Sequence, residues 1–458
     1  MKKLSLLLIL PMLLFTTSCE KFIEDYDVSP NSPSEVTPGL LLTMTQVAVF
    51  AQYTGQLSRN AAVYAQQING TDFQMLDVAN YVLFEGDNVN EWTSIYTDIL
   101  MESQALIDMS GENPWYRGMG RVIKAMGLGL ATDCWGDIPN REALGGLGGA
   151  ANFNPNYDAQ EVVYEDIIAL LDAAIVDFGK DISDNKILPG GEDLIYGGDV
   201  TLWMKAAYTL KARYTMHLSA RGASMQDVID ALANGISDNS EDMMAVFGTS
   251  GNELNTWYAF ENARPGYMHM HATFIDFLVS ISDPRLPFFA STDDNGGYSG
   301  TPLGSADQTT SPVGSYLATT GQPVPLATYE EALFLKAEAY MRLNNAGSAA
   351  TAHNDAIKAS VLKVTGASDP AFEAAQASET AASISLNKIM THKWVACFGM
   401  FEVWNDWRRT GIPTLVPNPN GEVAGIPLRF PTPLDERVSN SNALVISDIL
   451  LPVWWDNN

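Results

Sequence analysis

The recurrence of apolar residues at spacings of three and four constrains the fold of this chain more than any other feature. Such spacing gathers apolar side chains on one face of an α-helix. It predicts helices at residues 40–51, 89–107, 116–131, 158–178, 199–219, 225–236, 329–343, 349–362 and 386–398. In the helix at 158–178, Asp158 and Glu161 have the spacing of a capping box. The apolar stripe that follows comprises Val162, Ile167, Ile168, Leu171, Ala174, Ile175 and Phe178. We therefore expect a mainly α protein.

Three of these helices share a short theme of an apolar residue, lysine and alanine, at residues 123–125, 204–206 and 335–337. Each precedes a second amphipathic segment, and the alanines of the last pair would let two helices approach closely, as in tetratricopeptide helix pairs. The copies are irregularly spaced, so we expect helix pairs separated by insertions. Small and large residues also alternate in other packed helical proteins, which leaves the repeat open.

Long stretches rich in Gly, Pro, Asn and Ser interrupt the helical pattern. They lie at residues 145–156, 248–268, 291–325 and 412–426. Loops of this length within a compact body usually carry function. A binding site is expected there.

The N-terminus carries an export signal. Lys2 and Lys3 precede an apolar run at residues 4–15, and small residues follow up to Cys19. The run is too short to cross a bilayer core of about 30 Å as a helix. A cysteine at this place resembles a bacterial lipobox, which implies that Cys19 becomes the lipidated N-terminus; the alternative is an ordinary secretory peptide with a chance cysteine. We expect a signal peptide at 1–18, a flexible lipidated tether at 19–38 and one folded domain at 39–458.

Charge and cysteine content exclude other classes. The formal net charge is -28, from 54 acidic and 26 basic residues, so nucleic acids and anionic lipid surfaces would be repelled. We expect no nucleic-acid partner. Apart from Cys19, the only cysteines are Cys134 and Cys397. They are expected to be separate core residues, although a disulfide between them stays open.

Sequence signatures of common enzymes are missing. There is no Gly-x-Ser-x-Gly, His-Glu-x-x-His or Walker-type motif. We expect no enzyme activity and no cofactor, although a glycosidase needs only two carboxylates about 5 to 10 Å apart, which a sequence does not reveal.

No metal site is expected either. His269 and His271 would share a strand face, but no further ligand pattern accompanies them, and solvated loop histidines are the favoured interpretation. Asp293, Asp294 and Asn295 offer oxygen ligands, yet the glutamate that closes a calcium loop is absent.

Several segments resemble, in the right order, the SusD/RagB family of outer-membrane lipoproteins. They are residues 156–161 (NYDAQE), 198–213 (with Gly198, Asp199, Trp203 and Arg213), 283–286 (DPRL), 331–340 (EALFLKAEAY), 404–411 (WNDWRRTG), 426–431 (IPLRFP) and 454–456 (WWD). The terminal Trp-Trp-Asp resembles one branch of that family. Asp283 to Leu286 is expected to start a helix or turn with Arg285 pairing a carboxylate. Trp404, Trp407, Arg408 and Arg409 are expected to pack rather than to bind ligand.

The resemblance implies a body of tetratricopeptide-like helix pairs and a lipid anchor on the cell surface. It also implies a role as a nutrient-binding lid on a SusC-like TonB-dependent transporter in the outer membrane. No ligand-binding residue can be transferred by motif. Aromatic and polar side chains suit oligosaccharides, and two clusters offer them: Asp72, Phe73, Tyr81, Asn90 and Trp92, and Asn255, Trp257, Tyr258, Arg264 and Tyr267.

The sequence therefore predicts a non-catalytic cell-surface lipoprotein that binds an oligomeric nutrient, with a glycan favoured over a peptide. Two alternatives stay open. One is a lipid-anchored glycoside hydrolase, and the other is a helical-repeat module that binds peptide or protein.

Overall fold

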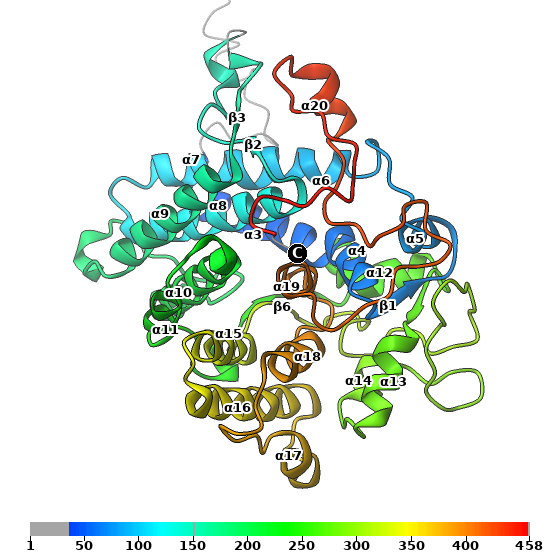
Figure 1. The fold of residues 1–458 in the computed structure, drawn as a ribbon. Helices are drawn as coiled ribbons and strands as arrows, with labels where there is room; N and C mark the ends of the chain where they lie inside the picture. The colour runs from blue at the N-terminus through cyan, green and yellow to red at the C-terminus, as the bar shows by residue number, and fades with distance from the viewer. Residues whose placement is uncertain (1–35, 150–151, 457–458) are drawn as a thin grey trace, which may run out of the picture.

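The computed structural model describes residues 36–149 and 152–456, and it confirms the mainly α-helical fold (Figure 1). Cys19, the signal peptide and most of the predicted tether lie outside these residues. The first helix starts at Pro38, next to the predicted start of folding at residue 39. Thr37 caps it by accepting a hydrogen bond from the amide of Leu40 at 3.3 Å. Within the described residues, no helix is both long enough and apolar enough to span a bilayer.

In the N-terminal half, α3, α6, α7, α8 and α9 form a layer across the upper part of the molecule in Figure 1, with α8 and α9 packed together. A π-helical segment, η1 (Ile95–Met101), interrupts the helix predicted at 89–107, between α6 and α7. The helices of this half are α3 (Pro38–Thr54), α4 (Gln56–Tyr64), α5 (Phe73–Ala79), α6 (Val89–Ser94), α7 (Glu102–Met109), α8 (Pro114–Trp135) and α9 (Gln160–Phe178).

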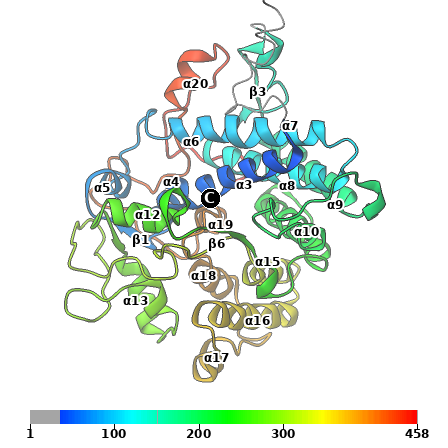
Figure 2. The ribbon, with the colours of Figure 1, turned by 180° about the vertical axis from the view of Figure 1, so that it is seen from behind.

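The second half completes the body, and Figure 2 shows it from behind. Its helices are α10 (Val200–His217), α11 (Met225–Leu232), α12 (Thr256–Ala263), α13 (Ala272–Ser280), α14 (Leu286–Phe289), α15 (Tyr329–Arg342), α16 (Ala346–Thr365), α17 (Pro370–Gln376), α18 (Leu386–Ala396), α19 (Glu402–Thr410) and α20 (Leu434–Ser439). The shared lysine-alanine motif lies in the first helix of each of three packed pairs, namely α8 with α9, α10 with α11, and α15 with α16. The predicted helix pairs are therefore present.

Short antiparallel strand pairs join distant parts of the chain. β1 (Ile68–Gly70) pairs with β5 (Met268–Met270), β2 (Ile138–Pro139) with β3 (Tyr157–Asp158), and β4 (Met243–Ala245) with β6 (Val324–Ala327). Gly70 ends β1 where a Cβ atom would lie 1.6 Å from the carbonyl oxygen of Met75, so only glycine lets α5 follow so closely. The β1–β5 pair fixes α5 beside the segment after α12.

The capping box predicted at Asp158 is wrong. α9 begins at Gln160, and its N-cap residue, Ala159, makes no side-chain hydrogen bond. Asp158 belongs to β3, opposite Ile138. From there its carboxylate accepts hydrogen bonds from the amides of Asn140 and Arg141, at 3.2 and 2.7 Å, and so stabilises the turn after β2.

The predicted apolar stripe of α9 is also partly wrong. Val162 is only half-buried, whereas Val163 and Tyr164 are buried instead. The start of the helix is therefore rotated relative to the expected face, while Ile167, Leu171 and Phe178 lie in the core as predicted.

The histidines expected to be solvated are instead buried. His269 lies in β5 and His271 caps α13, with 4% and 2% of their surfaces exposed. Their Nδ1 atoms hydrogen-bond the carbonyl of Thr310 and the amide of Thr273, at 2.8 and 3.0 Å. The described residues contain no group of three or more His, Cys, Asp or Glu arranged to hold a metal ion.

Candidate functional site

Two stacked aromatic rings lie at the surface where α5 meets the segment before β5. Phe73, at the start of α5, is 67% exposed. Its ring lies nearly parallel to that of Tyr267, with centroids 5.2 Å apart and planes 19° apart. The contact follows from the β1–β5 pairing, which continues through a hydrogen bond of 2.9 Å from the amide of Thr71 to the carbonyl of Tyr267. The structure thus joins one residue of each predicted cluster in what we call the Phe73–Tyr267 platform.

The backbone holds Phe73 in an unfavourable conformation. Its φ angle is +39°, in the left-handed region that bulky residues rarely adopt. Asp72 fixes the turn by accepting a hydrogen bond from the amide of Phe73 at 2.9 Å. Such a conformation costs about 1 to 3 kcal/mol and is concentrated at functional sites. Burial of the ring does not offset this cost, because the ring is mostly exposed.

Cationic and aromatic side chains extend the platform onto α12. The edge of Phe260 meets Tyr267, with centroids 6.2 Å apart. The guanidinium groups of Arg59 and Arg264 both lie over Phe260, at 4.3 and 5.2 Å from its ring centroid. Arg264 is exposed and Arg59 is buried. Phe260 and Arg59 are buried and support the platform from beneath, so Arg264 is the exposed hydrogen-bond donor beside the stacked rings.

Other predicted site residues lie elsewhere. Four of them are buried in the core: Tyr81, Trp92, Asn255 and Trp257. Asn255, for example, caps α12 by accepting hydrogen bonds from the amides of Trp257 and Tyr258, at 2.8 and 3.0 Å. Asn90 is exposed on α6, and Tyr258 is half-buried on α12. In this conformation the four core residues offer little surface to a ligand.

Arg59 and Phe260, which lie beneath the platform, were not among the residues predicted from the sequence. Arg59 lies in α4, whose residues from Leu57 to Tyr64 are all buried, so no apolar periodicity marks the helix. Phe260 lies in α12, inside the stretch at 248–268 that was expected to be irregular. No local pattern links the two residues, because their contact forms only in the folded chain.

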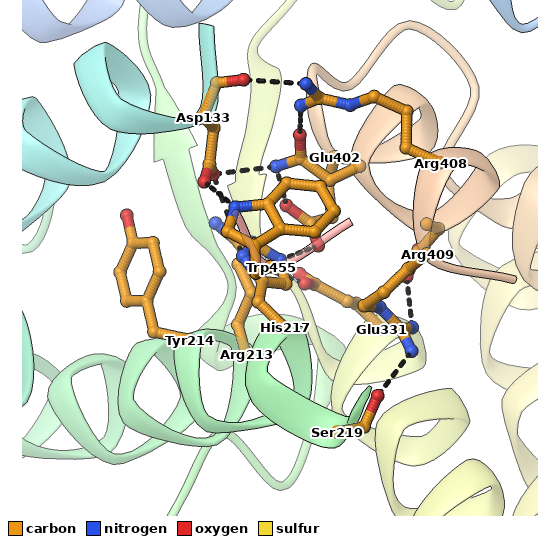
Figure 3. Close-up of polar contacts among 12 residues, drawn as sticks. Asp133, Arg213, Tyr214, His217, Ser219, Glu331, Glu402, Arg408, Arg409 and Trp455 are labelled. Carbon is orange, nitrogen blue, oxygen red and sulfur yellow. Dashed lines mark hydrogen bonds and ion pairs between the residues drawn. The ribbon is translucent and has the colours of Figure 1, made fainter. Parts of the chain in front are cut away.

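A second cluster of functional-type side chains lies in the core and connects four parts of the chain (Figure 3). Asp133 of α8 accepts hydrogen bonds at Oδ1 from the indole nitrogen of Trp455 at 2.9 Å, and at Oδ2 from the amide nitrogen of Asn405 at 2.9 Å. Nε2 of His217 lies 2.6 Å from Oε1 of Glu402. The adjoining cavity measures about 10 Å³, room for a single water molecule. A substrate cannot reach these carboxylates in this conformation.

The arginine motifs are structural, as predicted. Arg408 lies over the ring of Trp404, 3.7 Å from its centroid. Arg409 pairs with Glu338 at 2.6 Å, and Arg285 pairs with Asp283 at 2.6 Å.

Two further predictions concern possible disulfide and calcium sites. Cys134 and Cys397 are buried free thiols, so they do not form the disulfide that the sequence left open. The carboxylate of Asp293 accepts hydrogen bonds from the amides of Asn295 and Gly297, both at 2.9 Å. The loop therefore provides its own donors for this carboxylate.

Comparisons with known proteins agree with this fold. A family model for SusD-like proteins, described as starch-binding and associating with the outer membrane, matches residues 30–433. A SusD/RagB family protein from Bacteroides thetaiotaomicron is 25% identical, with 92% of this chain and 99% of that chain covered and a TM-score of 0.76. A chitin-binding SusD homologue from Flavobacterium johnsoniae is 22% identical, with 91% and 99% covered and a TM-score of 0.78.

A third similar structure is a SusD homologue from Bacteroides fragilis, 22% identical, with 92% and 100% covered and a TM-score of 0.76. A search of curated proteins found no match. Since the family model spans most of the sequence, from before α3 to just before α20, the chain belongs to the SusD-like family.

Proposed function

We propose that this protein is a non-catalytic cell-surface receptor that binds an oligomeric glycan on the Phe73–Tyr267 platform. One observation carries the proposal: two stacked rings are held at the surface by a backbone under strain. The apolar C–H face of a sugar ring packs on such rings, while neighbouring polar groups bond its hydroxyls. The starch-binding description of the family and the chitin-binding homologue from Flavobacterium johnsoniae support a glycan ligand.

Two further residues of the predicted clusters belong to this proposed site. Asp72 directly precedes Phe73, and the exposed Arg264 lies over Phe260, which contacts Tyr267. We assign both to hydrogen bonds with sugar hydroxyls. The buried Tyr81, Trp92, Asn255 and Trp257 stabilise the fold around the site.

Binding measurements on the purified protein test the proposal. Titration calorimetry with neutral oligosaccharides should show affinity for at least one of them. Replacing Phe73 or Tyr267 with alanine should weaken that binding about tenfold or more, because a stacking face is lost. Phe153→Ala is the matched control, since Phe153 is 59% exposed in the loop before β3. Unchanged affinity in both platform variants would contradict the proposal.

We also propose that lipidated Cys19 anchors the protein in the outer membrane through a tether at residues 19–38. Beside it, a SusC-like TonB-dependent transporter would receive the glycan. The family description, which names association with the outer membrane, supports this location.

Affinity purification from detergent-solubilised outer membranes should recover a large TonB-dependent barrel together with this protein. The Cys19→Ser variant should lose radiolabelled palmitate. Recovery of the protein without a barrel would contradict the partnership.

A further inference from the structure

A second cavity opens beside the platform, between α4, α5 and the loop at residues 80–88. It measures about 170 Å³ and is lined on one side by Gln74 and Met75, the two residues that follow Phe73. Typical small-molecule pockets measure about 300 to 1,000 Å³. The cavity therefore suits a single ring, not an oligomer. We call it the Asn60 pocket, after the residue on α4 that lines it.

Asn60 is an unusual residue for a protein core. Only 1% of its surface is exposed, and neither Nδ2 nor Oδ1 has a hydrogen-bond partner within residues 36–149 and 152–456. Buried amide groups are normally satisfied, because each unmade hydrogen bond leaves a desolvated polar atom. A free donor and a free acceptor on one wall of a cavity indicate a missing polar group that both donates and accepts.

Arg59 lines the same pocket and is also incompletely satisfied. It is nine-tenths buried, its Nε has no partner, and its hydrogen bond from Nη1 to the carbonyl of Thr256 is long, at 3.5 Å. Arg213, Arg285 and Arg409 are buried as well, yet each contacts a carboxylate at 2.6 Å. In the described part of the chain Arg59 forms no such ion pair. Burial lowers its pKa to about 10, and the charges of Glu91 and Glu261, which act in the opposite direction, do not offset this effect.

The remaining lining residues define the charge of the missing group. Asp77 and Asp87 line the pocket, so two carboxylates oppose the one guanidinium. An anionic ligand would be repelled by this net negative lining, whereas a neutral ligand would not. Hydroxyl groups suit this mixed lining, because each can accept a hydrogen bond from Arg59 or Asn60 and donate one to a carboxylate. Val78, Leu83 and Phe84 supply apolar surface for ring carbons.

We propose that the Asn60 pocket binds one uncharged sugar residue of a glycan whose neighbouring residues lie on the Phe73–Tyr267 platform, a step that rests on the proposed function. Asn60 bonds two adjacent hydroxyl or amide groups of that residue, and Arg59 donates to its oxygens. The receptor is thereby selective for neutral over acidic glycans.

The variant Asn60→Leu separates binding from folding. Leucine has the branched shape of asparagine, with methyl groups in place of the amide atoms, and it removes an amide that has no partner in the free protein, so the melting temperature should stay the same or rise. Affinity for the preferred neutral oligosaccharide should fall about tenfold or more. A second variant, Val82→Trp, should fill the pocket from the loop and lower affinity similarly. Asn234→Leu is the control and should bind like wild type, because Asn234 is exposed just after α11, a helix that lies on the other side of the molecule in Figure 1.

The titration uses maltohexaose, cellohexaose, chitohexaose and hexagalacturonate as probes. Binding of a neutral probe that both pocket variants weaken supports the inference. If wild type binds a neutral probe and Phe73→Ala weakens it, but both pocket variants bind normally, the pocket assignment fails while the proposed function stands. Hexagalacturonate bound as tightly as any neutral probe overturns the charge selectivity. If wild type binds none of the probes, the proposed function fails together with the inference.

Discussion

The large ring of Phe73 is exposed to water, and the backbone of this residue has a φ angle that glycine would adopt more easily. The φ angle of +39° and the exposed fraction of 67% both oppose stability. Strain of this kind survives where the surrounding structure holds it and where function needs the side chain. Here β1, Asp72 and the stacking on Tyr267 hold it.

The strain at residue 73 predicts an unusual order of stabilities. Phe73→Gly and Phe73→Ala both remove the ring, but only glycine relaxes the left-handed backbone. Urea unfolding should therefore show Phe73→Gly to be more stable than Phe73→Ala by about 1 kcal/mol. The same pair of substitutions at Gln74, the next residue of α5, is the control. There glycine should be less stable than alanine by about 1 kcal/mol. An alanine variant at 73 that equals or exceeds the glycine variant would show that the backbone is not strained.

Among the elements, the sequence predicted the long helices and missed the short ones. α9 and α16 each have one exposed and one buried face, which apolar spacing reveals. α4 is buried all round and includes Ser58, Arg59 and Asn60 among its buried residues, so its pattern resembles no amphipathic helix. A local sequence pattern could not predict the Phe73–Tyr267 platform either. Phe73 and Tyr267 were both candidates, but their stacking depends on a strand pair between distant segments, which no local pattern encodes.

Helices α16 and α18 meet through two histidines that make the fold sensitive to acid. The rings of His353 and His392 have centroids 5.3 Å apart. Neither nitrogen of His353 has a hydrogen-bond partner within the described residues, nor does Nδ1 of His392. Burial lowers the pKa of His353 to about 4 and that of His392 to about 3. Arg285, Asp283, Glu379 and Lys388 also face one or both rings, but the net effect favours the neutral form.

The direction of the pH effect follows from these pKa values. Below pH 6.5, the ordinary histidine pKa, His353 and His392 bind protons in the unfolded chain but stay neutral in the folded chain. The contribution of these two neutral histidines to the free energy of unfolding is therefore complete above pH 6.5 and is lost as the pH falls toward 4. Urea unfolding at about pH 5 should show a loss of roughly 2 kcal/mol per histidine relative to pH 7. The double variant His353→Leu with His392→Leu should lose less. Equal losses in both proteins would place the acid sensitivity elsewhere.

Across the whole molecule, the buried polar cluster of Figure 3 ties the C-terminus to the centre of the body. Trp455 is fully buried, donates from its indole nitrogen to Asp133 of α8, and lies 5.5 Å from His217 of α10 between ring centroids. Arg408 of α19 lies 4.8 Å from the centroid of the Trp455 ring. Trp455 thus contacts helices from both halves, and this gives the Trp-Trp-Asp segment a structural role.

Truncating this contact should destabilise the entire fold, not just its C-terminus. Trp455→Ala removes a fully buried ring and a hydrogen bond to the buried carboxylate of Asp133, so we expect a loss of about 3 to 5 kcal/mol in the free energy of unfolding. The adjacent Trp454 is half-buried and contacts Arg221, 5.0 Å from its ring centroid. Trp454→Ala should therefore lose far less. Thermal and urea unfolding followed by circular dichroism compare the two. Because helices of both halves meet at Trp455, the weakened protein should still unfold in one transition. A separate early transition would instead show that the C-terminal segment is a local attachment to an independently stable body.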